Sequence, residues 1–267
     1  GITATLSGVI SGAGTGALAI NDATNNGTVI FSGTNTYTSA TTINGGILGV
    51  TADTSLGAAP GSVTAASITL AGGVLQAFGI TGETSGNTTT LVANRGITLT
   101  AASGLAASTT TTSGTSYVDN LTVNGIITGA YVLTINGASQ SGKVTLNGVN
   151  TYGQSVSPYG GTIISGGTLQ IGGAGTWANP NANTLSIATG AVFQYSSTAA
   201  SSIVGLVSGG GSIIKDTSAS STLSLSNSSN NTFTGGVTVK AGTLYFSAAN
   251  GAGTGTITLG DSSGNNA

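Results

Sequence analysis

The sequence contains one block of residues three times, and this repeat constrains the fold more than any other feature. Each copy begins with an Asn-Thr-aromatic triplet, at Asn35, Asn150 and Asn231, and later carries two short apolar segments separated by a Gly-containing turn. Before each triplet lies a Gly-flanked apolar stretch, which we call the upstream segment; its copies are residues 8–12, 125–129 and 205–209. The first residue of this segment precedes the Asn by 27, 25 and 26 positions. Such near-constant spacing indicates a structural repeat rather than a product of composition.

The blocks alternate apolar and polar residues, a pattern typical of half-buried β-strands. Nothing in the chain sustains a 3.6-residue period, so we expect essentially no helix. The separating Gly and Asn residues are typical of tight turns between short strands. The predicted inward positions are Val29, Phe31, Thr41, Ile43, Leu48 and Val50 in the first copy, Val144, Leu146, Thr162, Ile164, Leu169 and Ile171 in the second, and Leu223, Leu225, Val237, Val239, Leu244 and Phe246 in the third.

Short strands with frequent turns fit a sandwich, a barrel or a solenoid. The repeat favours the solenoid, because one unit cannot bury its apolar side alone and stacked units share a continuous core. We therefore predict an all-β fold, a right-handed parallel β-helix with coils of about 20 residues, the low end of solenoid repeats. The chain is expected to form one domain, residues 1–267, built of three irregular repeats at about 8–124, 125–204 and 205–267.

Charged residues make up only 4% of the chain, with four basic and six acidic side chains and no His or Cys. Without His and Cys the chain lacks the usual transition-metal ligands and the commonest proton shuttle, which excludes zinc enzymes, cysteine proteases and Ser-His-Asp hydrolases. Four basic residues are too few to neutralise a nucleic-acid backbone or to bind an anionic membrane surface. No apolar run is long enough for a transmembrane helix. We expect no catalytic residue, cofactor, metal ion, nucleic-acid partner or membrane insertion.

Isolated charged and aromatic residues are the remaining candidates for a site. The acidic residues are scattered, unlike the paired carboxylates of enzymes that cleave polysaccharides. Asp216 next to Lys215 is interpreted as a solvated ion pair. Tyr159, Trp177 and Tyr195 are candidates for a sugar-stacking surface, with Tyr159 and Trp177 as the predicted glycan contacts. The alternative for Trp177 is a loop residue that covers the edge of the core.

The two ends of a solenoid expose open strand edges, which proteins normally cap. Neither end of this chain has a recognisable cap. We predict that copies stack head to tail, with the last coil of one completing the first coil of the next; such a contact does not close and builds a filament. The alternative is that the chain is a segment of a longer β-helix. The predicted assembly residues are Gly1, Ile2, Thr3, Ala4, Thr5, Leu6, Thr256, Ile257, Thr258 and Leu259.

Residues 32–38, Ser-Gly-Thr-Asn-Thr-Tyr-Thr, followed by residues 42–48, Thr-Ile-Asn-Gly-Gly-Ile-Leu, resemble the autotransporter-associated β-strand repeat. That repeat is typical of the passenger regions of bacterial type V secreted proteins and of related giant surface proteins. The resemblance implies a right-handed β-helix, export across the outer membrane, and a surface or adhesive role. The middle copy departs from the pattern by six additional residues, 154–159.

Together these features predict a non-enzymatic extracellular rod, secreted or held at a bacterial cell surface, whose partner is itself in filaments or a surface layer. The alternative is an adhesin passenger fragment that binds glycans or host surfaces. A third interpretation, a polysaccharide-active enzyme, requires a cluster of acids that the sequence does not display.

Overall fold

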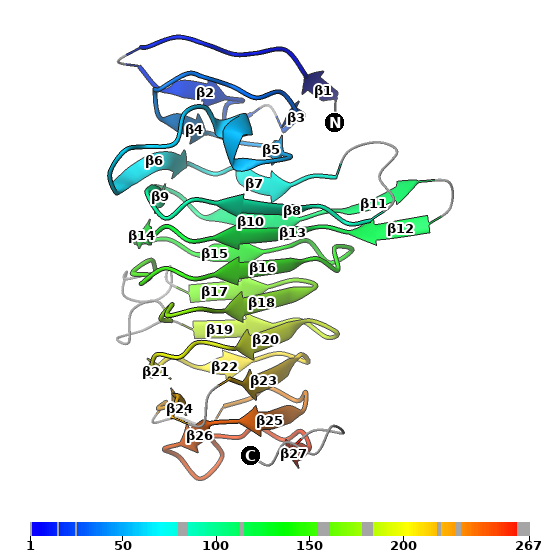
Figure 1. The fold of residues 1–267 in the computed structure, drawn as a ribbon. Coiled ribbons are helices and arrows are strands. Elements are labelled where there is room, and N and C mark those ends of the chain that lie inside the picture. Colours follow the sequence, from blue (N-terminus) through cyan, green and yellow to red (C-terminus); the bar gives the residue numbers. More distant parts are fainter. Residues whose placement is uncertain are drawn as a thin grey trace.

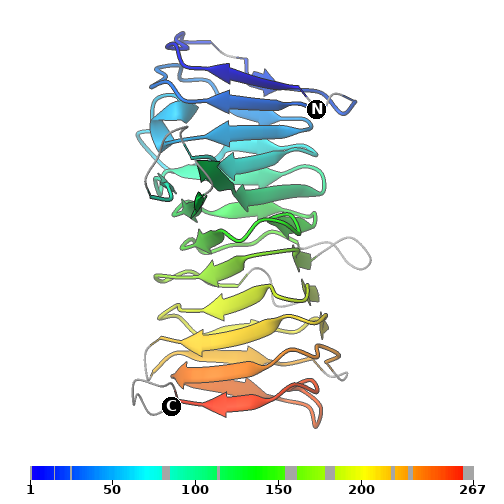
Figure 2. The ribbon, with the colours of Figure 1, turned by 90° about the vertical axis from the view of Figure 1, so that its right-hand side faces the viewer.

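The computed structural model is a rod of stacked β-coils, with the two ends of the chain at opposite ends of the rod (Figure 1). The coils follow one another along the rod axis in sequence order (Figure 2). The described residues hold no α-helix and one short 3₁₀ helix, η1 (Asp53–Leu56). The predicted all-β parallel β-helix is confirmed. The structure describes residues 2–14, 16–24, 26–79, 85–112, 115–153, 161–177, 184–217, 220–227 and 231–260.

Three faces enclose the core, and the chain visits them in the fixed order 1, 2, 3. Face 1 is a nine-stranded sheet of β1 (Thr3–Leu6), β3 (Thr28–Phe31), β5 (Ile47–Val50), β7 (Val74–Ala77), β10 (Ser103–Ala107), β15 (Leu133–Ile135), β17 (Gly161–Ile164), β19 (Thr184–Ile187) and β22 (Val207–Ser208). Face 2 is an eight-stranded sheet of β8 (Thr88–Leu91), β13 (Asn120–Val123), β16 (Lys143–Leu146), β18 (Thr168–Ile171), β20 (Val192–Tyr195), β23 (Ser212–Asp216), β25 (Val237–Ala241) and β27 (Ile257–Leu259).

Face 3 is divided into two sheets along the rod. The five-stranded part consists of β2 (Leu18–Ile20), β4 (Thr41–Ile43), β6 (Thr64–Leu70), β9 (Arg95–Leu99) and β14 (Ile127–Gly129). The three-stranded part consists of β21 (Ser201–Ile203), β24 (Thr222–Leu225) and β26 (Thr243–Phe246). We assign both to one face because β14 and β21 each follow a strand of face 2 and precede a strand of face 1.

Nearly all strands of the described chain pair in parallel, but the coils vary in length. Paired residues in successive coils are as close as Thr28 and Ile47, 19 positions apart, and as distant as Thr88 and Asn120, 32 positions apart. The expected 20-residue coil is therefore too short for most of the rod, because long connections between faces add residues without adding rungs. One such connection is an antiparallel hairpin of β11 (Thr109–Thr112) and β12 (Thr115–Val118), which projects sideways from the rod (Figure 1).

Inward side chains form continuous columns along the axis, as the two-residue period predicts. On face 1, Leu48, Leu75, Leu105 and Ile135 are paired in register and none is measurably exposed. The predicted inward residues of the first two copies are buried apart from the half-buried Val29 near one end, and Leu244 and Phe246 are half-buried near the other. Removal of apolar area from water at about 25 cal/mol per Å² makes these columns the main stabilising feature of the rod.

The Asn of each repeat ties three successive coils together. Its side-chain oxygen accepts a hydrogen bond from a backbone N–H of the upstream segment one coil earlier, and its side-chain NH₂ donates to a carbonyl one coil later. The acceptor bonds run from Ile10 to Asn35 (2.7 Å), Ile127 to Asn150 (3.1 Å) and Val207 to Asn231 (3.0 Å). The donor bonds run to the carbonyls of Ser55 (2.6 Å), Thr176 (3.3 Å) and Gly251 (2.7 Å). This contact explains why the upstream segment and the Asn keep a constant spacing.

The aromatic residue of each triplet fills the core two positions after the Asn. Tyr37, Tyr152 and Phe233 are 3%, 0% and 0% exposed. The hydroxyl of Tyr37 lies 2.9 Å from that of Thr41, and the hydroxyl of Tyr152 lies 3.0 Å from that of Thr162. In the third repeat the aromatic residue has no hydroxyl, and the residue aligned with the two threonines is Val237. The polar pair is thus replaced as a unit by an apolar pair.

The three repeats begin on different faces of the rod. The strand before the Asn is β3 on face 1 in the first copy, β16 on face 2 in the second and β24 on face 3 in the third. The strand after it is β4 on face 3, β17 on face 1 and β25 on face 2, respectively. Each copy follows the same path around the core from a starting point shifted by one face, so the three faces offer equivalent surroundings to one sequence motif.

Candidate functional sites

The first strand of the described residues, β1, forms one end face of the rod. All four residues of β1 are exposed, although Ala4 and Leu6 are in register with Val29 and Phe31 of the interior columns. Leu6 is 39% exposed and Ile2 is 84% exposed. The structure therefore places the predicted assembly residues Ile2–Leu6 together on one end face. Gly1 lies outside the described residues.

The C-terminal end shows the same arrangement on β27. Ile257 and Leu259 extend the columns of Val237 and Val239, yet they are 49% and 73% exposed. The carbonyl of Thr256 accepts a hydrogen bond of 2.8 Å from the N–H of Val237, which fixes the register of this last strand. The predicted assembly residues Thr256–Leu259 thus gather on the end face opposite β1.

The described charged residues are dispersed, and several form structural contacts instead of a reactive cluster. Arg95 is 2% exposed and forms a two-pronged ion pair with Asp53, at 2.9 Å from Nε to Oδ1 and 3.1 Å from an NH₂ nitrogen to Oδ2. The same guanidinium donates to the carbonyls of Leu56 (2.9 Å) and Gly57 (3.1 Å). Such paired, planar bonding is the arrangement that the guanidinium favours. Arg95 holds η1 and the following turn against the side of the rod.

Asp119 is completely buried at the base of the projecting hairpin. Its carboxylate accepts bonds from the backbone N–H groups of Gly79 (2.9 Å) and Asn87 (2.8 Å) and from the hydroxyls of Ser108 and Thr110. Four donors satisfy the charge without a basic partner. The residue anchors the long connections on either side of it, and sequence reasoning missed this role because a single Asp carries no local signal.

Lys215 corrects the expectation of a solvated pair with Asp216. The side chain points into the core from β23 and is 0% exposed. Its Nζ donates to the carbonyls of Thr217 and Ala241 (3.3 Å for the latter) and lies 5.8 Å from the centre of the Tyr195 ring. Burial lowers the pKa of Lys215 from its ordinary value, and the nearby Asp216 opposes that shift only in part. Alternation along the strand, which sends neighbouring side chains to opposite sides, separates the two charges.

The aromatic residues proposed as a sugar-stacking surface do not form one. Trp177 is 4% exposed, and its ring meets that of Phe193 edge to face at a centroid distance of 5.1 Å. Tyr195 is 0% exposed, so neither aromatic face is open to a sugar. The burial of Trp177 argues against the expected glycan contact and fits the alternative of a residue that covers the edge of the core. Tyr159 lies outside the described residues.

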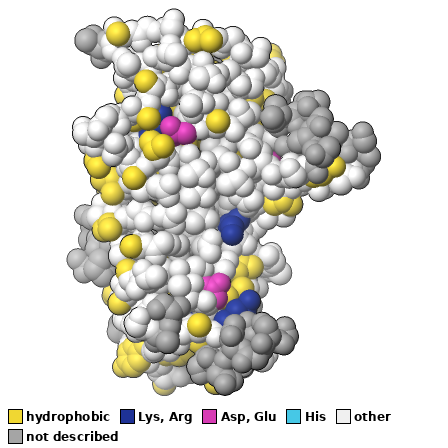
Figure 3. Space-filling model, viewed as in Figure 1, with side chains coloured by type: hydrophobic (Ala, Val, Ile, Leu, Met, Phe, Trp, Pro, Cys, Tyr) yellow, Lys and Arg dark blue, Asp and Glu magenta, His cyan; other side chains and the backbone are white. Residues whose placement is uncertain are grey.

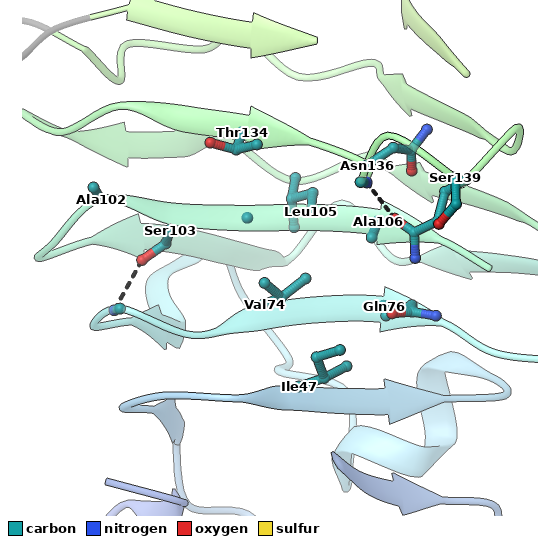
Figure 4. Close-up of a pocket in the computed structure, with 14 residues that line it drawn as sticks. Ile47, Val74, Gln76, Ala102, Ser103, Leu105, Ala106, Thr134, Asn136 and Ser139 are labelled. Atoms are coloured by element: carbon teal, nitrogen blue, oxygen red, sulfur yellow. Dashed lines mark hydrogen bonds between the residues drawn. The ribbon is translucent and has the colours of Figure 1, made fainter. Parts of the chain in front are cut away.

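A hollow in the described surface lies on the outer side of face 1. It spans four rungs, β5, β7, β10 and β15, and encloses about 520 Å³ (Figure 4). No described residue that lines it carries a charge. Charged side chains also form only isolated spots on the side of the rod shown in Figure 3. In the described residues no group of three His, Cys, Asp or Glu side chains could hold a metal ion.

Comparison with known protein families identifies the repeat. Three regions match the family model described as Passenger-associated-transport-repeat, at residues 22–50, 138–171 and 220–245, and each contains one of the three Asn-Thr-aromatic triplets. The chain carries three passenger-associated transport repeats. The resemblance to autotransporter passengers seen in the sequence is confirmed, whereas no curated protein and no solved structure matches the chain. Within the described residues, none of the helical structure is long and apolar enough for a membrane span.

Proposed function

We propose that the chain is a non-enzymatic, exported structural rod of the passenger type that joins further copies of itself head to tail into filaments or a surface layer. The observation that carries the proposal is the exposure of core-column residues on the first and last described strands, Leu6 on β1 and Leu259 on β27. Exposed apolar residues at the end of a column favour contact with another apolar surface, and an exposed strand edge favours a further strand. The passenger repeats support export to a bacterial surface or to the medium.

The polarity of the rod supports head-to-tail contact. Its rungs run parallel, and the two edges of a parallel strand differ, so a second copy continues the ladder only with its N-terminal face on the C-terminal face of the first. This contact is heterologous and builds an open filament.

The order of faces also predicts which elements meet. At the N-terminal end, β1 lies on face 1, and residues 8–12, which follow it, form hydrogen bonds with residues 36–38 in the position of face 2. At the opposite end, face 1 finishes at residues 253–254 and face 2 finishes at β27. In the filament, β1 therefore covers residues 253–254 and the upstream segment 8–12 covers β27, so that Val9, 67% exposed, approaches the exposed Leu259.

Electron microscopy and analytical ultracentrifugation of the purified chain test the proposal. We expect the 25.3 kDa chain to form rods that lengthen with concentration, and we expect Leu259→Asp to stop elongation because it places a charge on the end of a core column. The matched control is Ile163→Asp, since Ile163 is an exposed apolar residue (41%) on the side of the rod. Single rods of constant length at every concentration, or equal elongation of the Leu259→Asp variant, would contradict the proposal.

A further inference from the structure

The hollow on face 1, which we call the face-1 groove, exists because its floor lacks side chains. The outward positions of β10 are Gly104 and Ala106, between the larger outward residues of β7 and β15. Val74 and Thr134 flank Gly104 in register, so they form the two walls. A Cβ on Gly104 would lie 3.0 Å from Cγ2 of Val74, closer than ordinary side-chain contacts allow. Glycine at this position therefore keeps the groove open.

An unpaired amide lies on one wall of the groove. Gln76 is only 5% exposed and lines the cavity, and its side chain forms no hydrogen bond with any described residue (Figure 4). The residues in register with it, Gly49 and Ala106, offer no side-chain hydrogen-bonding group. The amide is not sealed from water, because among the described residues the buried polar side-chain atom without a partner is Nε1 of Trp177 and not an atom of Gln76. A bound polar group can therefore replace water at this amide.

The outward glutamines of face 2, in contrast to Gln76, form hydrogen bonds with side chains of neighbouring coils. Gln170 accepts a bond from the hydroxyl of Thr145 (3.2 Å) and donates to that of Ser196 (2.8 Å), in the coils on either side. Gln194 donates to the carboxylate of Asp216. Outward glutamines of face 2 thus link neighbouring coils, whereas the residues in register with Gln76, Gly49 and Ala106, carry no hydrogen-bonding side chain.

Other polar groups around the groove serve to fix its rim. Asn136 donates to the carbonyls of Gly142 (2.7 Å) and Gly166 (3.1 Å), and its oxygen accepts from the N–H of Ala107 (2.8 Å). Ser103 donates to the carbonyl of Ala101 and accepts from the N–H of Gly72. Asn136 and Ser103 are satisfied within the protein and hold the rim in place, whereas no such bond engages Gln76. A preformed site with few free polar groups is typical of small-ligand pockets, whose volumes run from about 300 to 1,000 Å³.

We propose that the face-1 groove binds an uncharged saccharide. Ile47 and Val74 offer apolar contact to the C–H face of a sugar ring, and the amide of Gln76 can donate to one hydroxyl and accept from another. No charged residue lines the groove, so nothing in it compensates a carboxylate or a sulfate. The main chain of the floor is engaged in the parallel ladder, so an extended peptide cannot add to it as a further strand. This site is independent of the assembly proposed above and uses residues other than the end faces.

Saturation-transfer NMR and titration calorimetry on the full chain test the proposal with maltotriose, cellotriose, mannotriose and N-acetylchitotriose as neutral probes, and with trigalacturonate as a charged probe. We expect at least one neutral probe to bind saturably and trigalacturonate to bind no better. Gln76→Leu should weaken binding tenfold or more, and Gly104→Val should abolish it by filling the floor. Gln170→Leu is the matched control, because it makes the same change on face 2 and should leave binding unaltered.

Circular dichroism and thermal melting are used to check that each variant retains the fold. If Gly104→Val does not fold, the conservative variant Gly104→Ala replaces it and should also weaken binding. The proposal is overturned if no neutral saccharide binds, if folded Gly104 variants bind like the unaltered chain, or if trigalacturonate binds more tightly than the neutral probes. Filament formation by the same variants is a separate measurement, since none of these changes touches an end face.

Discussion

The first two repeats and the third solve the same packing problem with different chemistry. In the first two, a buried tyrosine pairs with a buried threonine, as Tyr152 does with Thr162. In the third, Phe233 occupies the aromatic position and Val237 the threonine position, and both are fully buried. The Asn that precedes the aromatic residue makes the same bonds in all three repeats. The comparison teaches that the coil needs the Asn contact and an aromatic ring, while the hydroxyl pair is optional provided that both members change together.

The largest expected effect comes from removing the Asn side chain, whose hydrogen bonds are common to the three repeats. Asn150→Ala or Asn231→Ala leaves a buried N–H and buried carbonyls without partners, at about 1–3 kcal/mol for each unsatisfied group. We expect each change to lower the free energy of unfolding by about 3 kcal/mol, as measured by urea titration. Asn147→Ala is the control, because Asn147 is only half-buried and bonds to the side chain of Asn124. A smaller loss of unfolding free energy in Asn231→Ala than in Asn147→Ala would contradict the conclusion that each coil of the repeat needs the Asn contact.

The next effect is expected when only one of the two hydroxyls of the Tyr–Thr pair is introduced into the third repeat. Phe233→Tyr buries a hydroxyl opposite Val237, which offers no hydrogen-bonding group, and should destabilise the chain by about 2 kcal/mol. Val237→Thr alone should also destabilise it, whereas the double variant should recover most of the loss through the restored pair. Urea titration of the two single variants and the double variant measures the coupling. Additive losses in the double variant would show that the two positions act independently.

A smaller effect is expected for the reverse change in the second repeat. Tyr152→Phe leaves the Thr162 hydroxyl without its partner and should lower stability by about 1 kcal/mol. Burial raises the pKa of the Tyr152 phenol above its ordinary value of 10.0. A raised folded-state pKa gives stability that is present below pH 10 and declines as the pH rises further, because the unfolded phenol ionises first. The free energy of unfolding, measured between pH 9 and 11, should therefore decrease less steeply with pH in Tyr152→Phe than in the unaltered chain.

The smallest effect concerns a buried charge of the third repeat, one coil before Val239. Lys215 is in register with Val239, so Lys215→Met extends the apolar column at similar volume. We expect a gain in stability on the order of 1 kcal/mol or less at pH 7, since a buried charge is often replaced without loss. The folded-state pKa lies below the ordinary value of 10.5, so the unfolded state binds the proton more readily. Stability of the unaltered chain should rise with pH toward about 10, and Lys215→Met should remove that contribution to the slope.

The sequence predicts the inside of this rod better than its outside. Two-residue alternation places Leu48, Ile164 and Leu225 inward, because each strand has one buried side whatever its neighbours are. The spacing of the upstream segment and the Asn indicates a repeat, but the hydrogen bond between them was not predicted, because it depends on the coil length that the connections determine. The burial of Lys215 was not predicted, because lysine side chains are usually exposed to solvent. Only the alternation along β23, together with its register to the neighbouring strands, places this side chain in the core.

The face-1 groove illustrates why sites on such a rod resist prediction. Its walls come from β7 and β15, which are about 60 positions apart, and its floor from Gly104 between them. Coils of unequal length bring these residues together, so no local motif marks them. Gln76 gives no signal in the sequence, because its lack of a partner follows from two neighbours that lie one coil away in each direction.

The shifted starting faces of the three repeats bear on how such a protein can grow. A gene duplication that inserts a copy of the motif need not add whole turns, because strands on any of the three faces accept the same path around the core. Each insertion only has to advance the chain by a multiple of one third of a turn to leave the coils beyond it in register. Insertions of one, two or three thirds of a turn are therefore all compatible with the stack, whereas a solenoid whose motif is restricted to one face accepts only whole turns. Insertions of different length leave the copies of the motif at unequal spacings along the sequence.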